Sequence, residues 1–126
     1  DTVEVYDPQA DSWQQVASMP QCRHWHAAAA MGGKIYVTGG VARGTMLNSA
    51  CVYDPQADTW TQLANMGIAR RAHASAVVGG KLYIFGGQGT GGFELATAEV
   101  YDPASNSWAQ GLNLTSERSS FVAVAL

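Results

Sequence analysis

The sequence predicts an all-β protein made of a repeated unit, and two features indicate this. The tetrapeptide Val-Tyr-Asp-Pro occurs at residues 5–8, 52–55 and 100–103. A tryptophan follows each copy, and these tryptophans stand 47 and 48 residues apart: Trp13, Trp60 and Trp108. Repetition at a fixed period of this length is typical of repeat architectures, in which every copy forms the same small structural unit.

Short apolar runs bounded by glycine pairs predict the first two strands of each unit, which we call strands a and b. Strand a is expected at residues 27–31, 74–78 and 122–126, and strand b at residues 34–38 and 81–85. Short runs rich in β-branched and aromatic residues between turn residues are typical of strands. No segment requires a helix.

The repeated tetrapeptide predicts a hairpin between strand c, which ends at the Val-Tyr pair, and strand d, which holds the tryptophan. The turn reads Asp-Pro-x-x-[Asp/Asn]-x-Trp. Aspartate accepts backbone hydrogen bonds, proline presets the turn angle, and the fifth turn residue tolerates a left-handed backbone: Asp11, Asp58 and Asn106. Variable loops at residues 41–48 and 88–96 link strand b to strand c.

The whole chain resembles kelch repeats. The resemblance rests on the glycine pair after strand b, the tyrosine before Asp-Pro, the tryptophan six residues after that aspartate and the arginine that opens strand a. It implies a kelch-type β-propeller, partial, with two complete four-stranded blades and incomplete blades at both ends. The expected units are a partial blade 1–22, a blade 23–69, a blade 70–117 and the start of a further blade, 118–126.

The length of 126 residues is short for a closed ring, which takes about four to eight blades. We expect either a segment of a longer kelch protein or copies that associate to complete a ring, although such copies would leave each composite blade without strand b. Broken ends expose unpaired strand edges. Light scattering on this chain is therefore expected to show association or aggregation.

Composition limits the choice of partner. The formal net charge is -3, too small to favour nucleic acid or a membrane. No apolar run approaches the roughly 20 residues of a membrane helix. We therefore expect no nucleic-acid partner and no membrane partner. Composition leaves the compartment open, with the cytoplasm favoured.

The cysteines and histidines predict no metal site. Cys22 and Cys51 fall at non-equivalent positions of the repeat and are expected to be free thiols. No carboxylate or cysteine joins the three histidines at ligand spacing: His24, His26 and His73. We therefore expect no metal and no cofactor.

Charge is expected to separate between the two faces of the disc. Because strand direction alternates, the d-to-a and b-to-c connections share one face, which we call the loop face. All five arginines are predicted there: Arg23, Arg43, Arg70, Arg71 and Arg118. Against Glu94 and Glu117 this gives the loop face about +3, and the opposite face about -3. A positive face attracts an acidic partner, since guanidinium binds carboxylates in bidentate fashion.

The resemblance implies that the same face binds peptides. In kelch propellers that capture peptide motifs, arginines at the start of strand a contact acidic groups, which implies this role for Arg23, Arg70 and Arg118. Further candidates are the residues that follow them and the residue after the second glycine pair: His24, Arg71, Ser119 and Gln88. Val41, at the place of Gln88 in the other unit, departs from the polar residues some relatives use.

A structural role is the alternative for the repeated arginines, since they can hydrogen-bond neighbouring backbone and join one blade to the next. Arg43 and Arg71 do not recur, and a non-repeated charge on a loop of a rigid scaffold is a functional candidate. The repeated tryptophans and tyrosines are expected to pack between sheets.

These observations predict a non-catalytic interaction module that binds an acidic peptide or protein through the arginine-rich loop face. No catalytic residue is assigned. The alternative is part of a propeller enzyme that acts on a carbohydrate or a small anion, oxidase-like or sugar-mutarotase-like, because arginine and histidine lie near the expected channel mouth.

Overall fold

Two four-stranded antiparallel sheets form the centre of the protein, a computed structural model that describes residues 2–125. The first blade contains, in spatial order, β3 (Ala27–Met31), β4 (Lys34–Thr38), β7 (Ala50–Asp54) and β8 (Thr59–Gln62). The second blade contains β9 (Ala74–Val78), β10 (Lys81–Phe85), β11 (Ala98–Asp102) and β12 (Ser107–Gln110). No helix long and apolar enough to span a membrane occurs in this part of the chain.

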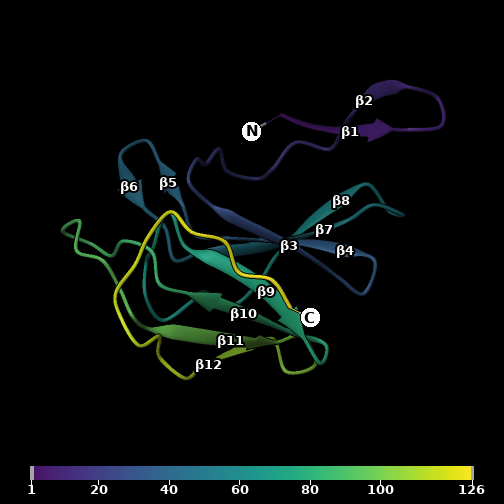
Figure 1. Cartoon of the computed structure of the whole chain (residues 1–126). Coiled ribbons are helices and arrows are strands. Elements are labelled where there is room, and N and C mark those ends of the chain that lie inside the picture. Colours follow the sequence, from purple (N-terminus) through teal and green to yellow (C-terminus); the bar gives the residue numbers. More distant parts are fainter. Residues whose placement is uncertain (1, 126) are drawn as a thin grey trace.

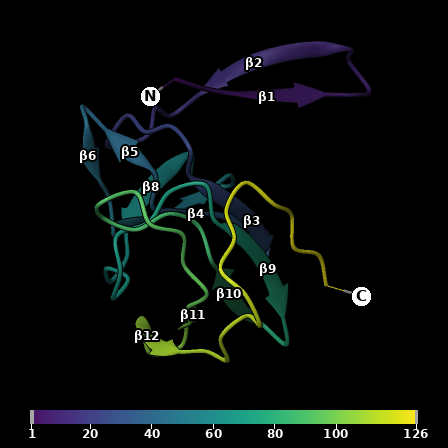
Figure 2. The same ribbon diagram turned by 60° about the vertical axis from the view of Figure 1, so that its left-hand side comes forward.

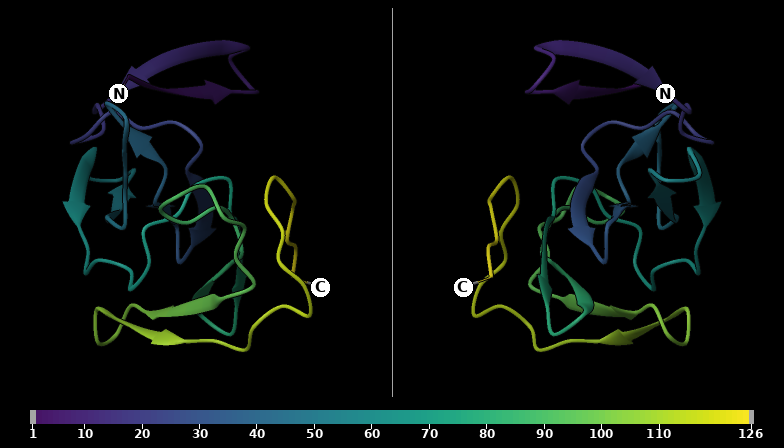
Figure 3. Two further views of the ribbon diagram at one scale, coloured as in Figure 1. Left: turned by 90° about the vertical axis from the view of Figure 1, so that its left-hand side faces the viewer. Right: turned by 90° about the vertical axis from the view of Figure 1, so that its right-hand side faces the viewer.

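Two hairpins accompany the blades. The first, β1 (Val3–Asp7) with β2 (Ser12–Val16), is set apart from both sheets (Figure 1, Figure 2). The second, β5 (Val41–Ala42) with β6 (Thr45–Met46), lies in the link from β4 to β7. The β1–β2 hairpin, the first blade and the second blade follow one another along an arc (Figure 3).

This arrangement confirms the predicted fold class: the described residues form an all-β, partial propeller without a closed ring. The two sheets fall inside the units 23–69 and 70–117. The unit boundaries themselves stay a proposal. Asp1 and Leu126, at the outer ends of units 1–22 and 118–126, lie outside the described residues.

The c-to-d turns have the predicted chemistry. In the first blade, the Asp54 carboxylate accepts hydrogen bonds from the backbone N–H groups of Gln56 (3.0 Å) and Ala57 (3.4 Å). Asp58 has a φ of 49°, and its equivalents Asp11 and Asn106 have 48° and 47°. Asparagine and aspartate tolerate this left-handed backbone, so the same turn forms three times.

The repeated aromatic residues pack as expected and also hold the link between units. Tyr53 and Trp60 lie 5.1 Å apart between ring centroids, and Tyr101 and Trp108 lie 5.0 Å apart. The Trp108 indole donates to the Ala64 carbonyl (2.8 Å), as Trp60 does to Ala17 (2.8 Å). Each outer strand thus fixes the segment that arrives from the preceding unit.

Two local predictions were wrong. Residues 122–125 form no strand, and within the described residues they pair with no neighbouring strand. Residues 41–48 are not a plain loop, because β5 and β6 pair across a two-residue turn at Arg43 and Gly44. Both turn residues have positive φ, 48° and 80°, the geometry that suits tight hairpins.

Candidate functional site

Each blade carries a small three-stranded ladder at its loop end, and we call these ladders the rims. In the first rim His24 pairs with Val41, which pairs with Met46. In the second rim Arg71 pairs with Gln88, which pairs with Glu94. Directly opposed residues in a ladder carry their side chains on the same side. The first rim is therefore largely apolar, whereas the second is charged.

Backbone hydrogen bonds between units hold the rims in place. The second glycine of each pair donates to the carbonyl of the next unit's arginine, Gly40 to Arg70 (2.9 Å) and Gly87 to Arg118 (2.8 Å). A Cβ on Gly40 would lie 2.6 Å from the His24 carbonyl oxygen, and this residue has a φ of 94°. Only glycine meets both demands, so the loop face rests on a tightly packed backbone.

Arg70 is buried in the second blade with no exposed surface. Its Nη1 donates to the carbonyls of Gly86 (2.6 Å) and Thr97 (3.1 Å), and its Nη2 donates to the Glu99 carboxylate (2.9 Å). Burial lowers the pKa of this guanidinium, and the Glu99 carboxylate opposes that shift. All these contacts lie within one blade and agree with a structural role. A role in partner binding stays a prediction.

Arg23 makes the corresponding contacts in the first blade. Its Nη1 donates to the carbonyls of Gly39 (3.0 Å) and Ser49 (3.2 Å), and its Nη2 donates to the Ser49 hydroxyl (3.2 Å). The position that Glu99 holds in the second blade is occupied by Cys51, which is fully buried. Arg23 is half-buried and has no carboxylate within salt-bridge distance among residues 2–125.

Arg71 differs from both, because it is held from two sides with its end left open. Its Cζ lies 4.6 Å from the centre of the Trp25 ring, and its Nε donates to the Gln88 side-chain oxygen (3.1 Å). No hydrogen bond engages its Nη1 or Nη2 within residues 2–125. The guanidinium therefore has a fixed orientation, and both terminal nitrogens are free to donate.

The remaining predicted residues are dispersed over the loop face. Arg43 is exposed at the β5–β6 turn, and His24 is exposed beside Trp25 with 4.9 Å between ring centroids. Arg118 is exposed and donates to the Ser116 hydroxyl (2.6 Å). Ser119 donates to the Glu94 carboxylate (2.7 Å). The structure brings together Arg71 with Gln88, and Ser119 with Glu94.

Trp25 is the residue that sequence reasoning missed. Its side chain is 56% exposed, and it occupies the place of Ala72 and Ser120 in the later units. All three have positive φ, 56°, 50° and 55°, so the repeat imposes this backbone whatever the side chain. The available signal was that Trp25 is the only tryptophan outside the 47-to-48-residue spacing.

The histidines and cysteines are not gathered into a metal site. Over residues 2–125, no group of three histidine, cysteine, aspartate or glutamate side chains is placed to hold a metal ion. Cys22 and Cys51 are free thiols, as predicted. His73 is buried with its Nε2 2.8 Å from the Thr38 hydroxyl, and burial lowers its pKa to about 3.

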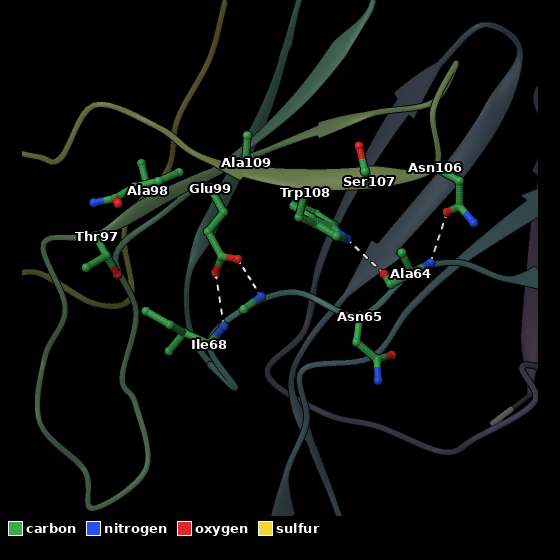
Figure 4. A pocket seen from close by; sticks show the side chains of 12 residues that line it. Ala64, Asn65, Ile68, Thr97, Ala98, Glu99, Asn106, Ser107, Trp108 and Ala109 are labelled. Atoms are coloured by element: carbon green, nitrogen blue, oxygen red, sulfur yellow. Dashed lines mark hydrogen bonds between the residues drawn. The ribbon is translucent and has the colours of Figure 1, made fainter.

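A groove of about 570 Å³ lies where the link from β8 to β9 crosses the outer strands of the second blade (Figure 4). Several polar groups on its wall already have partners within the protein. Glu99 accepts from the backbone N–H groups of Gly67 (2.5 Å) and Ile68 (3.2 Å), and Asn106 accepts from that of Ala64 (3.0 Å). The groove therefore holds the link in place and offers few free polar groups to a ligand.

The repeated sheets and the loop face define a repeat protein of the β-propeller class. Residues 1–125 match the family model described as the KLHDC2/KLHL20/DRC7 Kelch-repeats domain, so the chain belongs to this kelch-repeat family. Kelch-like protein 21 of Rattus norvegicus is 47% identical over 38 residues, which make up 30% of this chain and 6% of that relative. The chain thus matches a small part of that relative's length. Kelch repeats commonly serve as protein-interaction modules.

Proposed function

We propose that the chain is a non-catalytic interaction module whose loop face binds an acidic segment of a partner protein. The observation that carries this proposal is Arg71, a guanidinium fixed by Trp25 and Gln88 with both terminal nitrogens free. Guanidinium groups bind carboxylates through two parallel hydrogen bonds. Kelch-repeat relatives are generally non-enzymatic interaction modules, which supports the same assignment here.

The charges on the loop face support an acidic partner. Arg43 and Arg118 are exposed on the same face as Arg71. Glu99 neutralises Arg70, so the loop face carries about +2 when that carboxylate is counted. On the opposite face the two lysines are already paired with aspartates, Lys34 with Asp54 and Lys81 with Asp102, each at 3.0 Å. Free positive charge is therefore concentrated on the loop face.

Charge reversal on the two faces tests the proposal. Proteins captured by the chain are identified by mass spectrometry, and the affinity of each is then measured with purified protein. Arg43→Glu, Arg71→Glu and Arg118→Glu together are expected to weaken binding at least ~100-fold, since each lost charged contact is worth about 1.5–3 kcal/mol. Lys34→Glu with Lys81→Glu, which reverses two charges on the opposite face, is the control. Partners that respond equally to both sets would remove the proposal.

A further inference from the structure

We propose that two copies of this chain associate head to tail, so that the β1–β2 hairpin of each copy docks on the second blade of the other. The docking surface is the side of the second blade that points away from the first blade. We call it the far face, and it is formed by Val78, Tyr83 and Val100. The loop face takes no part in this contact.

Two hydrogen bonds recur wherever one unit meets the next within the chain. The tryptophan of strand d donates to a carbonyl in the link that leaves the preceding unit: Trp60 to Ala17 (2.8 Å) and Trp108 to Ala64 (2.8 Å). The left-handed turn residue accepts from the N–H of the same link residue: Asp58 from Ala17 (2.8 Å) and Asn106 from Ala64 (3.0 Å). A junction between units is therefore made by a c-to-d hairpin and a link.

Both of these elements are free at the ends of the arc. Trp13 is 67% exposed, and its indole N–H has no hydrogen bond within residues 2–125. Asp11 accepts only from the Tyr6 hydroxyl there (2.7 Å). At the other end Leu112 stands at the place of Ala64, and neither its N–H nor its carbonyl has a hydrogen bond within residues 2–125. Leu112 of one copy thus offers the missing partners to the hairpin of another.

The apolar surfaces at the two ends also match the junction between the blades. At that junction Tyr101 packs with Met31 and Tyr36, and all three are at most 8% exposed. On the far face Val78 stands at the place of Met31 and is 53% exposed. In the hairpin Tyr6 stands at the place of Tyr101 and is 42% exposed. Docking removes these apolar side chains from water, which favours association.

The number of blade positions predicts a closed dimer. The β1–β2 hairpin, the first blade and the second blade occupy three successive positions along the arc (Figure 3). Two copies fill six positions, within the range of about four to eight for closed propellers, whereas three copies would fill nine. A head-to-tail contact whose rotation closes gives a ring of fixed size. The dimer therefore contains two identical junctions.

Each junction between copies lacks the contribution of a strand b. At the junction between the blades, strand b contributes Leu82, which is fully buried with Met31 and Tyr36. The β1–β2 hairpin brings no counterpart of Leu82. A junction between copies therefore buries less apolar surface than the junction between the blades, and we expect a reversible association that depends on concentration.

Sedimentation equilibrium of the 126-residue chain tests the stoichiometry. We expect an equilibrium between a monomer of 13.3 kDa and a species of twice that mass. Trp13→Glu and Val78→Glu each alter both junctions and are expected to raise the dissociation constant at least ~100-fold, because each places a charge in an apolar contact. Phe93→Glu is the matched control, since Phe93 is 76% exposed on the loop face and should leave the equilibrium unchanged. Circular dichroism checks that each variant folds.

A mixture of the two variants distinguishes the head-to-tail arrangement from others. Trp13→Glu alone and Val78→Glu alone form dimers in which both junctions are altered. A mixed dimer carries both substitutions at one junction and leaves the other junction intact. The mixture is therefore expected to associate at least ~10-fold more tightly than either variant alone.

A conservative variant tests the contact with Leu112. Trp13→Phe keeps the aromatic ring and loses the N–H at both junctions, so it is expected to weaken association about 10-fold. A chain that stays monomeric up to about 1 mM, a mixture no tighter than its components, or a series of larger assemblies would overturn the head-to-tail dimer. Equal weakening by Phe93→Glu would also overturn it, because association would then run through the loop face.

Discussion

The two blades have the same arrangement of strands, but the repeated arginine has different partners in each. In the second blade the buried Arg70 is paired with Glu99 at 2.9 Å. In the first blade the equivalent Arg23 is half-buried and donates to the carbonyls of Gly39 and Ser49, and Cys51 stands at the position of Glu99. The repeat thus requires an arginine at this position for its hydrogen bonds to the b-to-c link, whereas the carboxylate partner is optional.

The preceding segment explains why the carboxylate suits only one blade. Glu99 accepts from the backbone N–H of Gly67 and of Ile68, ahead of Arg70. Pro20 stands at the place of Gly67 in the first unit, and proline has no N–H to donate. A carboxylate in the first blade would therefore lose one of its donors. Burial of a charge is costly unless such donors are present.

The largest difference between the blades is expected on removal of the carboxylate. Glu99→Ala leaves Arg70 buried without its counter-charge and orphans two backbone N–H groups, so it should lower the free energy of unfolding by about 3–5 kcal/mol. Cys51→Ala in the first blade removes only a small buried side chain and should cost about 1 kcal/mol. Urea denaturation measures both. Equal losses would show that the ion pair does not distinguish the blades.

Replacement of the repeated arginine in each blade tests the same difference in stability between the blades. Arg70→Met leaves Glu99 buried without a cation and should cost about 3 kcal/mol, while Arg23→Met leaves no unpaired charge and should cost about 1 kcal/mol. Thermal unfolding followed by circular dichroism ranks the two variants. A larger loss for Arg23→Met would contradict the proposed division.

The parts of the structure that repeat were the parts that sequence could predict. The strands, the c-to-d turns with left-handed Asp58 and Asn106, and the Tyr–Trp packing all follow from residues present in every copy. The strand expected at residues 122–126 was wrong over 122–125, because a strand forms only with a neighbour to pair with.

The site was less predictable because the roles of its residues depend on contacts between positions that are distant in sequence. Nothing local shows that Glu99 will reach Arg70, 29 residues away, and the arginine therefore suited a binding role and a structural role equally well. Trp25 escaped notice because only its position in space, against Arg71, gives it a role. Trp25 and Arg71, which contact each other, are thus both residues that break the repeat.

The buried histidine of the second blade predicts a stronger pH dependence than its equivalent in the first blade, His26, whose pKa is also lowered by burial. The pKa of His73 falls from 6.5 to about 3, mainly through burial and also through the nearby charges of Arg70 and His26. The folded state thus favours neutral histidine, so this stability is present above pH 6.5 and is lost as the pH falls toward about 3. Between pH 7 and pH 5 the free energy of unfolding should fall by about 2 kcal/mol.

Phenylalanine variants assign this slope to one blade. Phe121 occupies the position of His73 in the last unit, so His73→Phe is compatible with the repeat. It should remove most of the slope, as measured by urea denaturation at several pH values. His26→Phe changes the exposed equivalent in the first unit and should leave most of the slope in place. An unchanged slope in His73→Phe would mean that other groups titrate.

The smallest expected effect is a coupling between Pro20 and position 51, and it tests why the first blade has no carboxylate. Cys51→Glu alone places a buried charge next to Arg23 without the N–H that Gly67 supplies in the second blade. Pro20→Gly restores that donor. The free energy of unfolding of the double variant should therefore exceed the value expected from the sum of the two single changes by about 1 kcal/mol in a double-mutant cycle. The same cycle with Pro20→Ala, which also restores the N–H, should show a smaller coupling, because a Cβ at the equivalent Gly67 would lie 2.9 Å from Glu99 Oε1. Additive effects of Pro20→Gly and Cys51→Glu would show that the missing hydrogen bond does not explain why the first blade has no carboxylate.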